Sequence, residues 1–362
     1  MEFPIKYKNT LIYQLGIGLT VAFAALYFTV KDISLTELFE SFKRVDFYYI
    51  IMVVAILGLN YLCRVYRWQS ILEPTKKIGV LGLFPPVMIG YMGNLIPGGA
   101  GEILRPYLMA KKFNLTFSVA LASLAVERLF DLVILMLITG WVFWAQAGLF
   151  HPDLEISGIS VRSLAIKFGQ ISLGLTLGLV VFIYFLVWQK EKLLRFVKWT
   201  TTRLPENWRK KVEFLINEFS LGCSVVKNFW VMSRIAIFSA LIWITGIFAW
   251  YPLYLAYELE NITITSLLVL NVMVTILITV VPTPAFLGSY NAGVLIALHE
   301  IMNEPEIKAI SFGMISWGLF VATILAGGFY FILTEHFSFK TLAQIKKEGI
   351  TALSKEQQEN SE

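Results

Sequence analysis

The sequence predicts an all-α polytopic membrane protein, and three features lead to this fold class. Of its 362 residues, 57% are apolar and only 15% are charged, whereas a soluble domain carries about 25% charged residues. The apolar residues gather into runs of about 20, the length that crosses the hydrocarbon core of a bilayer as one helix. Two apolar regions are interrupted near their middle by proline and glycine, which indicates broken helices.

Six apolar runs are long enough to span a bilayer as single helices. They are Leu11–Val30, Phe47–Tyr66, Leu115–Trp144, Leu164–Trp188, Ser233–Tyr257 and Ile310–Leu333. Two further regions, Val80–Met109 and Ile262–Leu298, are each expected to form two half-helices that meet at a break. The sequence is compatible with re-entrant hairpins and with discontinuous crossings.

The first break combines helix-breaking residues with charge. It contains one proline and three glycines: Pro97, Gly98, Gly99 and Gly101. Asn94 precedes the break, and Glu102 and Arg105 follow it at the i, i+3 spacing that places them on one helix face. Broken backbone at membrane depth is tolerated only where it is buried in protein or lines a water-filled cavity. We interpret this stretch as half of a substrate site.

The second break has a different composition. Pro282, Pro284 and Gly288 interrupt the helix, and Ser289, Tyr290 and Asn291 follow with two hydroxyls and an amide but no charge. These groups would bind the hydroxyls of a lipid headgroup or close the cavity from the far side. A simple helix kink is the alternative interpretation.

Basic residues are distributed unevenly between the predicted loops, and this predicts the orientation. They precede the first span, follow the second span and the first broken region, fill the segment 189–232 with nine Lys or Arg, and follow the last span. The opposite loops hold acidic residues, namely Asp153, Glu155, Glu258, Glu260, Glu300, Glu304 and Glu306. We therefore expect both termini to face the cytoplasm.

The order of helix, broken hairpin and helix occurs twice, at about 47–145 and about 233–333. By the charge rule, the first unit's opening helix enters the cytoplasm and the second unit's opening helix leaves it. The units therefore form an inverted repeat, which is typical of secondary transporters whose substrate site lies at the paired breaks near the midplane.

Residues 1–336 are predicted to form one transmembrane domain, and residues 337–362 a partly disordered cytoplasmic tail. The segment 189–232 is too polar to span a bilayer. Its residues Trp208, Val212, Leu215 and Phe219 recur on one helical face. This predicts an amphipathic helix that either lies on the cytoplasmic membrane surface or packs on the bundle.

Charged side chains within the predicted spans are the main candidates for chemistry, because a charge at bilayer depth costs roughly 2.5–3.5 kcal/mol on insertion scales. They are Arg64, Arg67, Glu102, Arg105, Glu127, Arg128 and Asp131. One interpretation is a buried ion-pair network that fixes helix packing. The other is a polar cavity for an anionic headgroup, in which Arg64, Arg67 and Arg105 hold a phosphodiester by bidentate hydrogen bonds. Arg64 and Arg67 are alternatively interfacial anchors.

Other function classes find little support in the sequence. The three histidines have no metal-ligand spacing, so we expect no metal site and no cofactor. There is no phosphate-binding loop of an ATPase, so any transport would be passive or coupled to an ion or the membrane potential. An intramembrane glycosyl or acyl transferase would need Glu102, Glu127 or Asp131 as its base. A non-transporting partner subunit of a lipid or polysaccharide assembly system is the remaining class.

Two motifs point to a known family. The run from Pro97 to Arg105, with a Gly-Glu-x-x-Arg core, and the later Glu127-Arg128-Leu129-Phe130-Asp131 resemble the lysylphosphatidylglycerol synthase transmembrane family. This is the flippase-like membrane domain of the bacterial multiple peptide resistance factors. The second break departs from the pattern of that family, because Ala285 and Phe286 stand where glycines are usual and Asn291 where an acid is usual.

The resemblance implies a stand-alone transmembrane domain without the soluble aminoacyltransferase domain. We therefore expect no enzyme activity, but a lipid translocator that moves an anionic or glycosylated lipid between the leaflets of the bacterial cytoplasmic membrane. The expected partners are membrane lipids and not nucleic acid. A homodimer and an association with a lipid-modifying enzyme are both compatible with the sequence.

Overall fold

The computed structural model describes residues 35–43, 45–96, 100–149, 155–156, 159–189, 191–192, 194–195 and 228–335. The predicted span Leu11–Val30, most of the segment 189–232 and the tail lie outside these residues. So do Pro97, Gly98 and Gly99. The described residues are almost entirely helical, apart from a short antiparallel pair of strands, β1 (Glu155–Ile156) and β2 (Ile159–Ser160).

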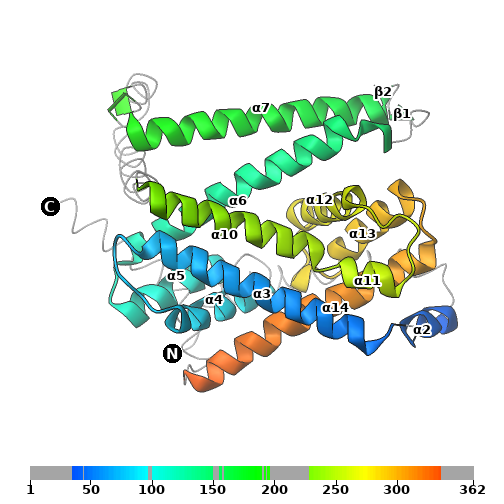
Figure 1. Ribbon diagram of the computed structural model, residues 1–362, viewed down its shortest axis with the longest axis horizontal. Helices are drawn as coiled ribbons and strands as arrows, with labels where there is room; N and C mark the ends of the chain where they lie inside the picture. Colours follow the sequence, from blue (N-terminus) through cyan, green and yellow to red (C-terminus); the bar gives the residue numbers. More distant parts are fainter. Residues whose placement is uncertain are drawn as a thin grey trace, which may run out of the picture.

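Three long apolar elements are α3 (Phe47–Leu72), α10 (Phe229–Phe248) with the short α11 (Tyr251–Ala256) after it, and α14 (Glu306–Thr334). Three stretches in the described residues are long and apolar enough to cross a membrane: Phe47–Leu72, Phe229–Ala256 and Glu306–Thr334. The predicted span Ser233–Tyr257 is interrupted between α10 and α11, where Pro252 lies in the first turn of α11. Figure 1 shows α3 and α10 crossing the molecule side by side.

The first predicted break separates α4 (Val80–Asn94) from α5 (Ala100–Phe113). The two helices form a hairpin. Its open end, which lies opposite the tip, is bridged by the Lys76 ammonium, which donates to the Phe113 carbonyl over 2.7 Å. Its arms approach so closely that a Cβ on Gly101 would lie 1.9 Å from the Gly90 carbonyl oxygen. Glycine at this position is therefore required by packing. We call α4–α5 the first hairpin.

The second broken region forms a similar hairpin. It comprises α12 (Ile264–Val280), the 3₁₀ turn η3 (Pro284–Phe286), α13 (Ser289–Leu295) and the π-helical turn η4 (Ile296–Ile301). Its open end is bridged by the Asn261 side-chain amide, which donates to the Met302 carbonyl over 2.7 Å. We call this the second hairpin. Both regions are thus broken near the middle, as the sequence predicts.

The tips of the two hairpins meet. The backbone N–H of Ala285, in η3, donates to the Leu95 carbonyl, just after α4, over 2.8 Å. The open ends lie at opposite ends of the molecule. Lys112 of the first hairpin pairs with Glu335 at one end, and the buried Glu304 carboxylate accepts from the backbone amides of Glu260 and Asn261 at the other.

Helices α6 (Phe117–Ala145) and α7 (Val161–Trp188) form a further antiparallel pair, joined through the turn η1 (Ala147–Leu149) and the two strands. Gly140 and Gly169 let these helices approach closely, because a Cβ on either would collide with the partner helix. In Figure 1, α7 lies on the outside of the molecule, and α6 passes from it toward α3 and the first hairpin. α6 thereby carries its charged residues to the hairpin. The short helix α2 (Leu35–Lys43) precedes α3.

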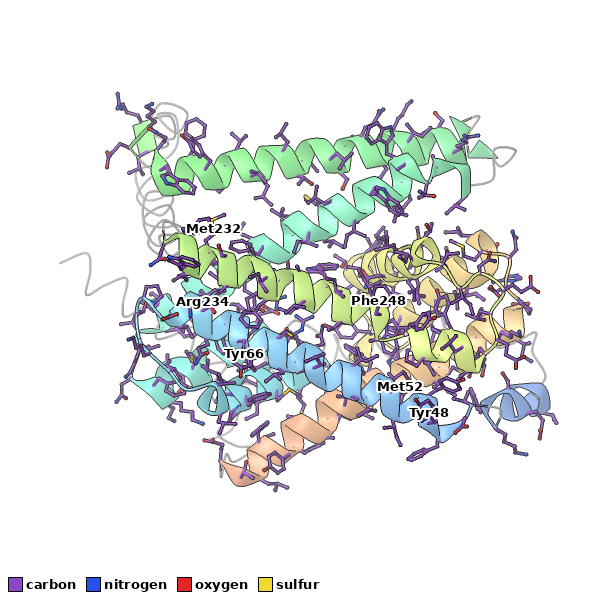
Figure 2. All side chains as sticks on the ribbon, in the orientation of Figure 1. Tyr48, Met52, Tyr66, Met232, Arg234 and Phe248 are labelled. Carbon is purple, nitrogen blue, oxygen red and sulfur yellow. The ribbon has the colours of Figure 1, made fainter. Side chains whose placement is uncertain are left out.

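The main hydrophobic core surrounds the second hairpin. Leu253 and Tyr254 of α11, Val272 of α12, Val294 of α13 and Phe312 of α14 are all fully buried there. A smaller core beneath the first hairpin includes Trp68 of α3. Figure 2 shows the direction of the crossing helices: Tyr66 and Arg234 lie at one end of the molecule and Tyr48 at the other. At the first of these ends, the Arg234 guanidinium pairs with Glu73.

Candidate functional site

The charged candidates from three separate parts of the sequence converge in one network between α3, α5 and α6. At its centre lies Glu127, whose side chain is fully buried on α6. The Arg105 guanidinium on α5 donates to both carboxylate oxygens of Glu127, over 3.0 and 2.8 Å. The Arg67 guanidinium on α3 lies 3.2 Å from the same carboxylate. One buried acid therefore ties three helices together.

Asp131, one helical turn after Glu127, is the second carboxylate of the network. It accepts two hydrogen bonds from Arg67, over 2.6 and 3.0 Å. Arg128 lies farther from it, at 3.8 Å. Arg67 also donates to the Ser239 hydroxyl on α10 over 3.3 Å. Because Arg67 is completely buried and bound to two acids, this geometry favours the ion-pair interpretation for Arg67 and equally for Arg105.

The outer edge of the network is more accessible. Glu102, in the first turn of α5, accepts from Arg128 over 2.8 Å, and their side chains remain 41% and 43% exposed. The Asn94 amide at the end of α4 also donates to Glu102, over 3.0 Å. Glu102 and Arg105 therefore share a face, as their spacing predicts, and that face meets the adjacent residues Glu127 and Arg128.

Arg64 has no carboxylate partner among the described residues. Its guanidinium donates to the Asn60 side-chain oxygen over 2.8 Å and to the Tyr91 hydroxyl over 2.7 Å. The network therefore combines four guanidinium groups with three carboxylates and carries one positive charge in excess. Such a surplus at membrane depth favours an anionic ligand.

Two aromatic residues that the sequence reasoning missed complete the site. The Arg105 guanidinium lies over the Trp68 ring, 4.0 Å from its centroid, and the Trp68 indole N–H donates to Ser123 on α6 over 3.0 Å. Tyr91 lies beside both Arg64 and Arg105. The sequence gives one indication of their role: arginines within predicted spans need partners, and an aromatic ring can be such a partner through a cation–π contact.

A small hollow opens at the first hairpin beside this network. It is lined by Gly90, Tyr91, Asn94, Gly101, Glu102, Arg105 and Arg128. The hollow is too small for a lipid headgroup in this conformation, so binding of a headgroup there would require the hairpin to open.

The second break contributes polar groups without charge. The Thr283 hydroxyl donates to the Leu287 carbonyl over 2.8 Å and lies 3.0 Å from the Ser289 hydroxyl. Tyr290 packs its ring against Trp250 and Phe320. In the described part of the chain, Ser289, Tyr290 and Asn291 make no hydrogen bond or ion pair with the charged network. Their place in a substrate site stays a prediction.

Asn291 is unusual among these residues. Its side chain is 3% exposed, and among the described residues neither atom of its amide has a hydrogen-bond partner. A buried polar group without a partner is costly.

Pro282, Pro284 and Gly288 lie in the turn before α13, where Gly288 has a φ of 79°.

Within the described residues, no group of three or more His, Cys, Asp or Glu side chains could hold a metal ion. The carboxylates of the network face guanidinium groups instead. Glu127, Asp131 and Glu102 are each paired with at least one arginine.

Comparison with known proteins agrees with the motifs. No curated protein and no solved structure matches the chain. Residues 15–328 match the family described as the lysylphosphatidylglycerol synthase TM region, and the matched part includes both hairpins and the whole charged network. The protein is therefore a multi-pass membrane protein that belongs to the lysylphosphatidylglycerol synthase transmembrane family.

Proposed function

We propose that this protein moves an anionic or glycosylated lipid between the two leaflets of the bacterial cytoplasmic membrane. Its membership of a lipid-related membrane family supports a lipid substrate. The observation that carries the proposal is the surplus positive charge beside the hollow of the first hairpin, which the Arg64 guanidinium supplies. A lipid phosphate would neutralise this charge while its acyl chains stay in the bilayer.

The arrangement of the hairpins supports a transport mechanism. Their open ends lie at opposite ends of the molecule and their tips touch through Ala285 and Leu95. We propose that both hairpins are re-entrant and belong to two inverted repeats, so that opening one or the other exposes the charged residues to one leaflet at a time.

The charge distribution suggests the orientation. Lys76, Lys112 and Arg234 gather at the open end of the first hairpin, and positive charge favours the cytoplasmic side. We propose that this end and both termini face the cytoplasm. A thiol reagent that cannot cross the membrane should label cysteine at the exposed position Glu300 in intact cells and not at Lys77. The opposite labelling pattern would contradict the orientation.

The same geometry argues against an intramembrane transferase. A general base must be able to accept a proton from the substrate. Glu127 is fully buried with both oxygens bound to Arg105, and Glu102 and Asp131 each face an arginine. We therefore propose a protein that moves lipid without a chemical step.

Reconstitution tests the proposed function directly. Purified protein in proteoliposomes should expose fluorescent phosphatidylglycerol to external dithionite faster than protein-free vesicles do. Arg128→Gln should slow this movement, because it removes the most accessible guanidinium at the hollow. Equal dithionite reduction with and without protein, for phosphatidylglycerol and for a glycolipid, would contradict the proposal.

A further inference from the structure

Among the described residues, one backbone hydrogen bond joins the tips of the two hairpins, and the residue that donates it, Ala285, is bound through both its N–H and its C=O group. The Ala285 N–H donates to the Leu95 carbonyl of the first hairpin over 2.8 Å. The Ala285 carbonyl accepts from the indole N–H of Trp317 on α14, also over 2.8 Å. The tip of the second hairpin is therefore bound to the other hairpin and to a long helix at the same time.

This tip has a strained backbone. Ala285 and Phe286 have φ angles of 50° and 60°, in the left-handed region that residues with a Cβ seldom adopt. Two such residues in succession persist only where the surrounding contacts impose the conformation. The two hydrogen bonds of Ala285 and the packing of Phe286 against Phe320 act here together with hydrogen bonds inside the turn, such as that from the Phe286 N–H to the Thr283 carbonyl. Loss of these contacts would let the tip relax.

The strained tip is directly connected to the charged hollow. Leu95 follows Asn94, which lines the hollow and donates to Glu102. Glu102 in turn holds Arg128. A separation of the tips would therefore release Leu95 and allow Asn94 and the wall of the hollow to move.

We propose that the backbone of Ala285 is a latch that closes the route between the hairpins, and that Trp317 is a positioning residue that keeps it closed. The proposal rests on the proposed lipid movement. Lipid passes only when the Leu95–Ala285 contact separates, and relief of the backbone strain at Ala285 and Phe286 favours this separation. The hollow is narrow in the latched conformation because both tips are held together.

Cross-linking tests whether the tips must separate. The variant carries Leu95→Cys and Ala285→Cys in a background where Cys63 and Cys223 are replaced by alanine. The backbone hydrogen bond remains available, because neither substitution removes its N–H or C=O group. A short thiol cross-linker should bridge the two positions and stop dithionite-accessible lipid movement. A cross-link between Met136→Cys and Ser172→Cys, across the α6–α7 contact, should leave movement unchanged.

A matched pair of tryptophan variants tests the role of Trp317. Trp317→Phe removes an N–H that binds Ala285, whereas Trp243→Phe removes an N–H without a partner. We expect Trp317→Phe to lower the yield of the Leu95–Ala285 cross-link and to speed lipid movement about fivefold, the effect of one hydrogen bond. We expect Trp243→Phe to change neither quantity.

The outcomes separate the two proposals. If the uncross-linked parent moves no lipid, the proposed function is wrong, whatever the cross-linking yields. If the parent moves lipid and the protein cross-linked at Leu95 and Ala285 moves it equally fast, the latch is wrong. Equal cross-linking yields for Trp317→Phe and Trp243→Phe would overturn the role of Trp317, and this comparison does not depend on transport.

Discussion

The two hairpins share a shape but differ in chemistry. The first hairpin presents Glu102 and Arg105 to a network of buried and half-buried charges. The second presents hydroxyls, the unpartnered amide of Asn291 and a strained turn, within the larger hydrophobic core. A shared shape therefore does not imply a shared role: in the function proposed above, the charged first hairpin recognises the ligand and the second hairpin acts as a gate.

The largest effect is expected at the centre of the charged network. Glu127→Gln removes the carboxylate that pairs with Arg105, which is also one of the two carboxylates that pair with Arg67. A buried guanidinium without its acid costs about 3–5 kcal/mol. We expect a large fall in the thermal unfolding temperature of the purified protein.

The matched control is Glu102→Gln, which breaks the pair whose side chains are 41% and 43% exposed. Exposed pairs contribute about 1 kcal/mol or less. Its unfolding temperature should therefore stay close to that of the parent. If the two variants are equally stable, the network does not hold the first hairpin in place.

A somewhat smaller effect on stability is expected from a larger side chain between α4 and α5, the two helices of the first hairpin. Gly101→Val would place atoms against the Gly90 carbonyl and the Asn94 side chain, so α4 and α5 must separate. Overpacking of this kind costs about 1–3 kcal/mol. Gly178→Val on α7 is the control, because a Cβ there meets no atom within 4 Å. Equal unfolding temperatures for the two variants would show that the arms are not in contact in solution.

The sequence predicts the broken helices well, because their causes are local. Proline and glycine gather around Pro97 and around Pro282 and Gly288, and both disfavour a continuous helix, so the sequence predicts a break in each region. The i, i+3 spacing of Glu102 and Arg105 correctly predicts a common face. The predicted span Ser233–Tyr257 corresponds to the single stretch Phe229–Ala256, and the sequence does not indicate the short turn between α10 and α11, whose local cause is Pro252.

The partners within the site are predicted less well, because they are set by tertiary packing. Sequence proximity favours a pair between Arg128 and Asp131, which the structure contains at 3.8 Å. The shorter contacts come from other helices, because Asp131 binds Arg67 from α3 and Arg128 binds Glu102 from α5. The stacking of Trp68 on Arg105 and the contact between Leu95 and Ala285 cannot be predicted from a periodic pattern in the sequence. The number of spans, the repeat relation and the site assignment of Asn291 stay predictions.

Arg64 gives a test of ligand recognition that is nearly separate from stability. Arg64→Gln removes the surplus positive charge but breaks only hydrogen bonds to the neutral partners Asn60 and Tyr91. We expect a stability loss of about 1 kcal/mol. A charge-assisted hydrogen bond contributes about 1.5–3 kcal/mol, so movement of phosphatidylglycerol should slow about tenfold or more.

Arg64→Lys keeps the charge without the planar fork of the guanidinium, and we expect an intermediate rate. The measurement is the initial rate of dithionite reduction at several lipid fractions. Identical rates for the parent and Arg64→Gln would mean that the surplus charge does not bind the substrate.

The smallest effect is expected at Asn291, where it sharpens the contrast between the hairpins. Both atoms of its buried amide lack a partner, so Asn291→Leu removes a desolvation cost and adds apolar contact at similar volume. We expect the unfolding temperature to stay unchanged or to rise by the equivalent of up to about 1 kcal/mol. At the first hairpin, Asn94→Leu should instead lower stability slightly, because the Asn94 amide donates to Glu102.

If Asn291→Leu stops lipid movement while the protein stays folded, the amide binds a ligand during transport. The second hairpin would then recognise the substrate as well as close its route, and the division of roles between the hairpins would be wrong.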